Sequence, residues 1–443
     1  MTSVTGSRVF AEMMKNYGVT HLFFVTAILT ESMAEMEDLG ITRVVTHGEK
    51  AAAYMADGYA RASHRAGVCL AQNVGAANLA AGIRDAAMAG APVIAITGGE
   101  EPGSRYCHAY QELEDFPMFA PVTKFTARLD VVSRLPDLLR QAFREATTGA
   151  PGPVHLRVAG NEGQLLKQQA SMLSFVEPQF ACFPAYRPGA DGVSLGRALR
   201  LLAQAQRPVI VAGGGVAASS ASRELVALAE KLSIPVATSM NAKEVILDRH
   251  PLAVGVVGSY SRSCANKVVS EADLVFFVGS HAGGQVTNNW KVPASPETVI
   301  QLDIDPAEIG RNYPAAIGLV GDAKVTLQQL IDEAPMGPER GPWLGRIREL
   351  VAEWREHSAS LLNSNAVPIR PERLCQAISN TLPGDGVLVA DTGHSGMWTA
   401  AMVEFNSMNQ RFLRCAGSLG WAFPAALGAK CALPDQTVVA FNG

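Results

Sequence analysis

Short apolar runs alternate along the chain with longer stretches rich in alanine and leucine. The short runs contain many β-branched residues and lack the polar alternation of a sheet that has one face in water. We therefore expect strands that are covered on both faces, in parallel sheets, and an α/β, doubly wound architecture. The predicted strands are residues 93–97, 154–158, 209–212, 274–278, 299–302, 387–390 and 438–441.

The stretch between two of these strands has the spacing of a helix. Leu225, Leu228 and Leu232 lie three and four residues apart, which places them on one face of an amphipathic helix. The helix should end before Ile234-Pro235, where the next strand begins.

Two segments interrupt the alternation and predict the domain boundaries. Residues 161–191 are rich in Gln, Pro, Gly and aromatic residues, and residues 332–371 begin with a Pro/Gly segment and continue into one charged helix. Three pieces result, at residues 1–165, 190–332 and 367–443. The first two have the size of a domain, and the third is about half a domain.

Composition and charge narrow the class of protein. Of the 443 residues, 48% are hydrophobic and 18% are charged, enough apolar residues for several cores. A net charge of −4 without any Lys/Arg-rich run argues against nucleic-acid binding. No apolar run could span a bilayer, and the N-terminal residues lack the pattern of a secretion signal. The seven cysteines are scattered singly, which is typical of a reducing compartment, so we expect a cytoplasmic protein.

One helix near the N-terminus is a candidate for chemistry. Small residues gather on one side of the segment that follows Glu49, which lets another backbone or a flat ring approach closely. Taken alone, Glu49 is an ordinary first-turn glutamate favoured by the helix dipole.

The same segment opens an ordered series of motifs that extends through the whole chain. The series resembles the thiamine-diphosphate-dependent enzymes of the acetolactate synthase type. It consists of Glu49 with Ala56-Asp57-Gly58-Tyr59-Ala60-Arg61, then Asn73-Val74-Gly75-Ala76-Ala77-Asn78, Gly82-Ile83-Arg84-Asp85-Ala86, Tyr110-Gln111-Glu112, Asp303-Ile304-Asp305-Pro306, Asp391-Thr392-Gly393 and Gly417-Ser418-Leu419-Gly420.

The resemblance implies an architecture and a reaction. Residues 1–165 would form a pyrimidine-binding domain, residues 190–332 a central domain, and residues 367–443 the first part of a diphosphate-binding domain. The reaction would decarboxylate a 2-oxo acid and then protonate the product or add it to an acceptor carbonyl, with thiamine diphosphate as the electron sink. The family also implies a homodimer or homotetramer with the active site at the subunit interface.

The resemblance also assigns roles to individual residues. Glu49 matches the catalytic glutamate that hydrogen-bonds a ring nitrogen of the cofactor's aminopyrimidine. Leu419 matches the apolar residue beneath the bent cofactor, although plain core packing is the alternative. Gln111 matches a polar residue near the cofactor, against a solvent-facing loop position, and His394 matches a diphosphate contact, against an exposed histidine. The cofactor-binding candidates are Gly75, Asn78, Gln111, Gly393, His394, Gly417 and Leu419.

Departures from the family pattern leave some properties open. Residues 26–30 lack the Pro-Gly-Gly turn of the acetolactate synthases, and Gly48 replaces a histidine, so pyruvate is not assumed as the substrate. For the middle domain, the Gly213–Gly215 run is consistent with a nucleotide. Ala282-Gly283-Gly284-Gln285 stands in place of the family's Phe-Asp-Asp-Arg stretch, so FAD and an empty or ADP-bound domain both stay open.

The resemblance implies that the metal ligands would lie beyond residue 443. The family's Mg²⁺ ligands follow a Gly-Asp-Gly motif whose first glycine would be Gly443, so no metal ligand is assigned. We expect a chain of this length to be inactive by itself. The alternatives are a non-catalytic homologue that binds a nucleotide or acts as a scaffold, and a nicotinamide dehydrogenase. The dehydrogenase would rest only on a glycine run that lacks the GxGxxG spacing.

Overall fold

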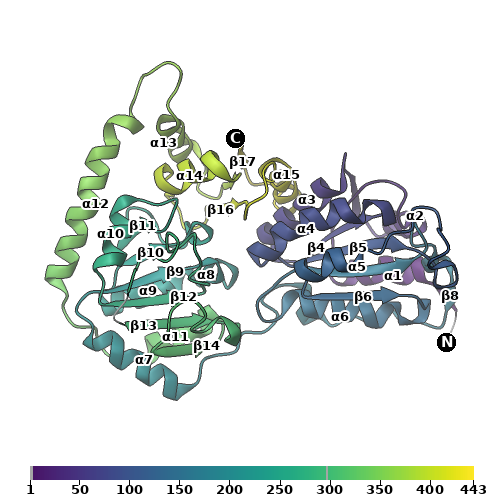
Figure 1. Ribbon diagram of the computed structural model, residues 1–443, viewed down its shortest axis with the longest axis horizontal. Coiled ribbons are helices and arrows are strands. Elements are labelled where there is room, and N and C mark those ends of the chain that lie inside the picture. The colour runs from purple at the N-terminus through teal and green to yellow at the C-terminus, as the bar shows by residue number, and fades with distance from the viewer. Residues whose placement is uncertain (1–2, 296–297) are drawn as a thin grey trace. The chain divides into compact units, whose positions relative to one another are not determined.

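The computed structural model describes residues 3–295 and 298–443, which form an α/β protein (Figure 1). The chain divides into two compact units. Unit 1 contains residues 1–186 together with 415–440, and unit 2 contains residues 187–414 together with 441–443. The predicted α/β architecture with parallel sheets is confirmed.

Unit 1 is built on a six-stranded parallel sheet in the order β3-β2-β4-β5-β7-β6. Neighbouring residues of one strand enter different cores: Ile94 and Ile96 pack on one face of the sheet, and Val93 and Ala95 pack on the other. Burial on both faces explains why these strands are apolar throughout. The strands are β2 (His21–Phe24), β3 (Thr42–Val45), β4 (Gly67–Ala71), β5 (Val93–Gly99), β6 (Phe125–Leu129) and β7 (Val154–Ala159).

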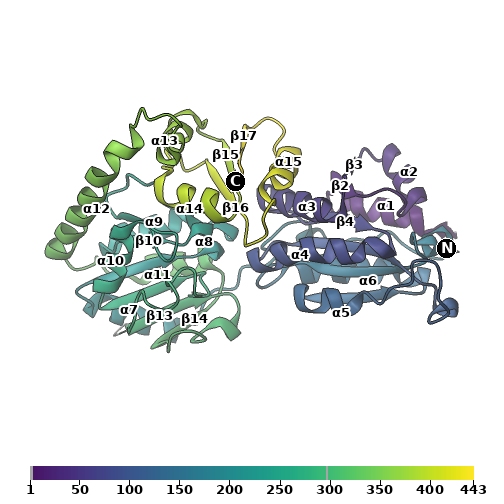
Figure 2. The same ribbon diagram turned by 45° about the horizontal axis from the view of Figure 1, so that its top comes forward.

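Helices cover both faces of this sheet (Figures 1 and 2). One face is covered by α1 (Gly6–Asn16), α2 (Thr30–Asp38) and α6 (Leu135–Thr147). The other face is covered by α3 (Glu49–Ser63) and α4 (Ala76–Ala89). The remaining elements are a short helix α5 (Phe116–Phe119) and an antiparallel pair, β1 (Val4–Thr5) with β8 (Gln169–Ala170).

Helix α15 (Ala422–Ala432) packs closely against α3 (Figures 1 and 2). A Cβ atom at Gly58 would collide with the carbonyl oxygen of Ala425, and a Cβ atom at Gly428 would collide with that of Met55. The small residues of α3 therefore permit the close approach that the sequence predicted, and the element that approaches is a second helix backbone.

Unit 2 contains a second six-stranded parallel sheet, in the order β11-β10-β9-β12-β13-β14. The predicted amphipathic helix is α9 (Ser222–Leu232), and its three leucines are buried. The strands are β9 (Pro208–Ala212), β10 (Val236–Thr238), β11 (Ala253–Val256), β12 (Leu274–Val278), β13 (Thr298–Asp303) and β14 (Ile317–Val320). The other helices are α7 (Gly192–Gln204), α8 (Gly214–Ala218), α10 (Ser263–Glu271), α11 (Ala323–Glu333) and α12 (Gly341–Leu362).

A third sheet of three strands has the order β16-β15-β17. Strands β15 and β16 are parallel. All seven strands predicted from the sequence are present, three of them with the predicted bounds and the others extended by up to two residues. The elements of this part are α13 (Pro371–Thr381), β15 (Val387–Ala390), α14 (Gly393–Met402), β16 (Arg411–Arg414) and β17 (Val438–Phe441).

A buried ion cluster joins two segments of unit 2. The carboxylate of Asp248 lies 2.7 Å from Arg262 and 3.4 Å from Lys243, and it accepts a hydrogen bond from the backbone N–H of Phe405. Burial acts to raise the pKa of Asp248, but the two cations hold that pKa below its ordinary value. Burial also lowers the pKa of Lys243 to about 8. The cluster therefore links β10–β11 to the segment after α14 through side chains that are buried.

Candidate functional site

Loops from three strands meet at the carboxyl edge of the unit 1 sheet. The side-chain amide of Gln72, after β4, donates to the carbonyl of Ala27, after β2, at 3.2 Å. Two backbone bonds connect these loops to the segment after β7: Leu29 N–H to the Glu162 carbonyl, and Asn73 N–H to the Asn161 carbonyl. The carboxyl edge of a parallel sheet is the usual place for a ligand site.

Glu49 opens α3 at this edge. It follows β3 after a short turn, and Gly48 precedes it in extended conformation. The side chain is half-buried, and one carboxylate oxygen accepts a hydrogen bond from Asn78 at 3.2 Å. A Cβ atom at Gly75 would lie 2.5 Å from the other carboxylate oxygen. The structure therefore brings together three of the predicted site residues, and Gly75 has to be glycine for the carboxylate to occupy this position.

Gln111 lies in the loop that follows β5. Its side-chain oxygen is buried and has no hydrogen-bond partner within the described ranges, and its backbone is left-handed with φ 61°. A solvent-facing position does not fit a buried amide oxygen, because such a group needs a hydrogen-bond partner. A bound ligand would supply one.

Gly417 and Leu419 lie in the loop between β16 and α15. Leu419 is 74% exposed, so the interpretation of this residue as plain core packing is wrong. The loop is held by a residue to which the sequence assigned no role: Asp85 of α4, whose buried carboxylate accepts the backbone N–H groups of Ala416 and Ser418. Two signals for Asp85 are present in the sequence: it is a carboxylate within an alanine-rich helix, and it belongs to the motif Gly82-Ile83-Arg84-Asp85-Ala86.

A second buried carboxylate anchors the end of this loop. Asp57 of α3 accepts a hydrogen bond from the indole N–H of Trp421 at 2.8 Å, and both residues are fully buried. Burial raises the pKa of Asp57 to about 6, although Arg61 and the hydrogen bond from Trp421 act to lower it.

Gly393 and His394 belong to unit 2, at the start of α14. Gly393 has a left-handed backbone with φ 65°, and His394 is exposed. The backbone N–H groups at a helix start have no partner within the helix and favour anions.

The turn at residues 26–30 keeps a left-handed backbone without any glycine. Ala27 has φ 68° and Leu29 has φ 47°, a conformation that costs about 1–2 kcal/mol for a residue with a side chain. Ile28 and Leu29 are buried in the core, whereas Thr26 is exposed. The side chain that this turn exposes at the carboxyl edge of the sheet is therefore a threonine.

A buried polar network lies under the loop that carries Gln111, and no pattern in the sequence indicates it. Thr97 Oγ1 lies 2.8 Å from both Asp115 Oδ2 and His155 Nε2, and Arg157 lies between Asp115 and Glu100. Burial raises the pKa of Asp115 to about 6 and lowers the pKa of His155 to about 3. The network is closed to solvent and supports the loop from below.

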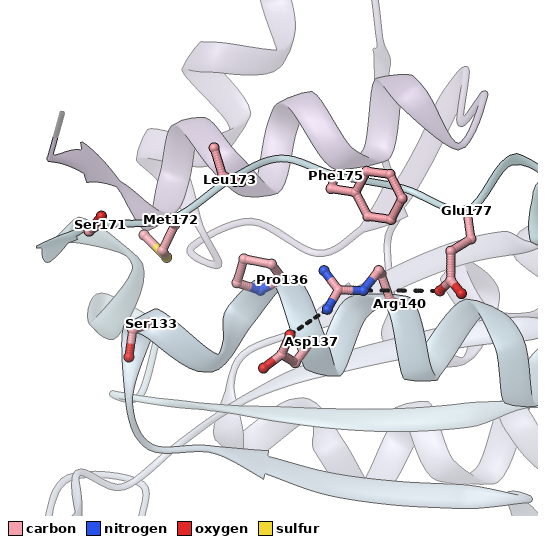
Figure 3. Close-up of a pocket in the computed structure, with 9 residues that line it drawn as sticks. All are labelled: Ser133, Pro136, Asp137, Arg140, Ser171, Met172, Leu173, Phe175 and Glu177. Atoms are coloured by element: carbon pink, nitrogen blue, oxygen red, sulfur yellow. Dashed lines mark hydrogen bonds and ion pairs between the residues drawn. The ribbon is translucent and has the colours of Figure 1, made fainter. Parts of the chain in front are cut away.

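A groove on the opposite face of the sheet from α3 carries no comparable chemistry (Figure 3). It has a volume of about 460 Å³ and lies between α6 and residues 171–177. Figure 3 shows the Arg140 guanidinium between Asp137 and Glu177, so its charge is already compensated. The lining residues are Ser133, Pro136, Asp137, Arg140, Ser171, Met172, Leu173, Phe175 and Glu177.

In unit 2, the loops after β9 and β12 pack on each other at the point where the strand order reverses. The N–H of Gly213 donates to the Val278 carbonyl, and that of Gly215 donates to the Gly279 carbonyl. Gln285, in place of the family's arginine, accepts a hydrogen bond from Arg414 at 2.9 Å.

Within the described part of the chain, no three His, Cys, Asp or Glu side chains are grouped to hold a metal ion. Among the described helices, none combines the length and hydropathy needed to cross a bilayer.

Comparison with known proteins identifies three family models in chain order. Residues 4–118 match the thiamine pyrophosphate enzyme N-terminal TPP binding domain. Residues 195–330 match the central domain of thiamine pyrophosphate enzymes, and residues 391–443 match their C-terminal TPP binding domain.

Curated relatives agree with these models. The chain is 36% identical over 421 residues to the probable acetolactate synthase large subunit of Methanocaldococcus jannaschii, a match that covers 92% of this chain and 70% of the relative. It is 30% identical to the acetolactate synthase isozyme 3 large subunit of Escherichia coli, covering 91% of this chain and 71% of the relative. The similarity thus extends over all three matched domains.

Proposed function

Because the chain belongs to the thiamine pyrophosphate enzyme family, we propose that it joins a decarboxylated 2-oxo acid to an acceptor carbonyl in the manner of an acetolactate synthase. The enzyme is thiamine-diphosphate-dependent and acetolactate synthase-like. The observation that carries the proposed role of Glu49 is its carboxylate, which lies against Gly75 and is hydrogen-bonded only by Asn78 among the described residues. The matches do not favour a non-catalytic homologue.

The residues at the carboxyl edge fit the pyrimidine end of the cofactor. Asn73 and Gln111 each have a buried amide oxygen without a hydrogen-bond partner among residues 3–295 and 298–443. An aminopyrimidine carries N–H groups that can satisfy such acceptors. Because position 75 is glycine, the Glu49 carboxylate can lie directly against this loop.

The chain's own residues then have distinct tasks. Glu49 would hold a proton at a ring nitrogen and return it, which is general acid–base work. Asn78 would orient the Glu49 carboxylate through its 3.2 Å hydrogen bond. Leu419 would support the cofactor from its exposed loop, and Gly393 and His394 at the start of α14 would receive the diphosphate. The cofactor itself supplies the electron sink for decarboxylation.

Further properties of the family extend the proposal. Mg²⁺ would bind with the diphosphate, the assembly would be a homodimer or homotetramer, and the protein would act in the cytoplasm. FAD would bind in the middle domain. The neutral Gln285 stands where the family has an arginine, and its side chain is already hydrogen-bonded to Arg414. Both observations argue against FAD. A flavin absorption spectrum of the native protein distinguishes FAD from an empty or ADP-bound domain.

An activity assay with matched glutamate variants tests the proposal. The protein at its native length is incubated with thiamine diphosphate, Mg²⁺ and a panel of 2-oxo acids that includes pyruvate, and CO₂ release and acetolactate are measured. We expect Glu49→Gln to lower kcat by about 10²–10⁴-fold, the usual contribution of a general acid–base group. Glu31→Gln is the control, because Glu31 is an exposed first-turn glutamate of α2 and should leave turnover unchanged. Equal turnover of both variants would refute the role of Glu49.

A further inference from the structure

Asp85 is a buried acidic residue in the middle of α4, where its neighbours in the core are apolar. We propose that Asp85 is a positioning residue that fixes the backbone of the loop at residues 415–420 and thereby places Leu419 for the cofactor. The inference rests on the proposed function, since it assigns Leu419 to the thiamine diphosphate site. It concerns a residue that does not touch the cofactor.

The geometry of the contact is specific. Asp85 Oδ1 accepts the N–H of Ala416 at 2.6 Å, and Oδ2 accepts the N–H of Ser418 at 2.9 Å. The thiol of Cys415 lies 3.6 Å from Oδ2. One carboxylate therefore binds the backbone N–H groups of Ala416 and Ser418. Gly417 lies between these two residues, and Leu419 follows directly after them.

Burial makes these bonds decisive for the loop conformation. The carboxylate of Asp85 is buried, and a buried carboxylate is costly unless it accepts hydrogen bonds. Charge-assisted bonds of this kind are also stronger than those between neutral groups. A loop that moved away from Asp85 would leave this buried carboxylate without its two backbone donors.

The far end of the loop is anchored by a second buried carboxylate. Trp421 is fully buried, donates its indole N–H to Asp57, and lies under the guanidinium of Arg61 at 5.1 Å. Gly420, with φ 81°, makes the turn between the two anchors. Leu419 is thus the apolar side chain held exposed between two fixed points. Burial of a leucine is favourable, so the exposed position of Leu419 is explained here by the two anchors that hold its backbone.

Hydrogen exchange measures the anchor directly, in the protein without any ligand. In Asp85→Ala, we expect the amides of Ala416 and Ser418 to exchange about 10- to 100-fold faster, the range for loss of a hydrogen bond to a charged acceptor. Asp85→Asn keeps one carbonyl acceptor and should give an intermediate rate. Arg84→Ala is the control, because Arg84 is exposed on the same helix. Amides of β5 report whether each variant is folded.

Cofactor binding then tests the consequence. We expect Asp85→Ala to raise the Kd for thiamine diphosphate by about tenfold or more, because a loosened loop no longer presents Leu419 in one position. The KM for the 2-oxo acid at saturating cofactor should change little, which a general loss of stability would not produce. The Asp85→Asn variant should recover part of the affinity.

The outcomes separate the two claims. Unchanged exchange at Ala416 and Ser418 in Asp85→Ala would overturn the anchor. Faster exchange with an unchanged cofactor Kd would overturn the placement of Leu419. A wild-type protein that does not bind thiamine diphosphate would refute the proposed function, and the exchange rates would still decide whether Asp85 fixes the loop.

Discussion

Replacement of His155 should change how the stability of unit 1 depends on pH. His155 is fully buried on β7, stacks on Phe119 at 3.7 Å and shares Thr97 with Asp115. Burial lowers its pKa from the ordinary 6.5 to about 3. Between these values the unfolded chain binds a proton that the folded protein does not, so His155 destabilises the fold progressively as pH falls from 6.5 toward 3.

The magnitude follows from the two pKa values. At pH 5, about 1.5 units below the unfolded value, the cost is about 2 kcal/mol at 1.36 kcal/mol per unit. Asp115 has the opposite sign, because burial raises its pKa from 3.8 to about 6. The folded state then keeps a proton that the unfolded state has lost, and stability rises by roughly 1 kcal/mol as pH falls to 5. The two effects oppose each other in the wild-type protein.

The variant His155→Gln removes the destabilisation that His155 causes at low pH and keeps the opposite effect of Asp115. At pH 8 the variant should be less stable than the wild type, because it loses the ring contact with Phe119. At pH 5 that difference should shrink by about 2 kcal/mol, which is roughly a 30-fold change in relative exchange rate. The assay is hydrogen exchange of β5 and β7 amides at both pH values, corrected for intrinsic rates. His108→Asn, at an exposed position in the same unit, is the control.

A constant difference between wild type and His155→Gln at pH 5 and pH 8 would refute the reasoning. It would mean that His155 titrates alike in the folded and unfolded states, and that the network is open to water. The same shift in His108→Asn would show that the effect is not specific to the buried site.

Two further substitutions test other features of the fold. Asp248→Asn leaves two buried cations without their counter-charge, so it should destabilise unit 2 by about 3–5 kcal/mol. Scanning calorimetry measures the loss, with Asp332→Asn at an exposed position as the control. Equal stability of the two variants would contradict the prediction. Ala27→Gly relieves a left-handed backbone, so it should stabilise unit 1 by about 1 kcal/mol in urea unfolding. The control Ala87→Gly, within α4, should destabilise by about 1 kcal/mol, and a loss in both variants would contradict the strain at Ala27.

The strands could be predicted well from the sequence because burial on both faces requires an apolar residue at every position. A strand such as β12 is apolar at every position, and its predicted bounds are those of the structure. The leucine spacing of α9 was equally direct. The small residues of α3 predicted a close approach, but the pattern could not show that the approaching element is α15, because the partner lies more than 350 residues away in the chain.

The parts that could not be predicted are those in which single polar groups are buried. Asp85 and His155 have no periodic pattern, and their partners are distant in sequence. Leu419 would pass for a core residue on hydrophobicity alone, and only the anchors on either side of it explain its exposure. The left-handed turn at Ala27 was missed because the turn contains no glycine to indicate it.

The most direct test of the central claim is the rate at which the thiazolium C2 proton of thiamine diphosphate exchanges with D₂O when the cofactor is bound. This rate does not depend on which 2-oxo acid is the substrate. We predict exchange that is much faster than for the free cofactor in the wild type, and slower by about 10²–10⁴-fold in Glu49→Gln. Exchange as slow as for the free cofactor, or equal in the two proteins, would contradict the role of Glu49 as the group that activates the cofactor.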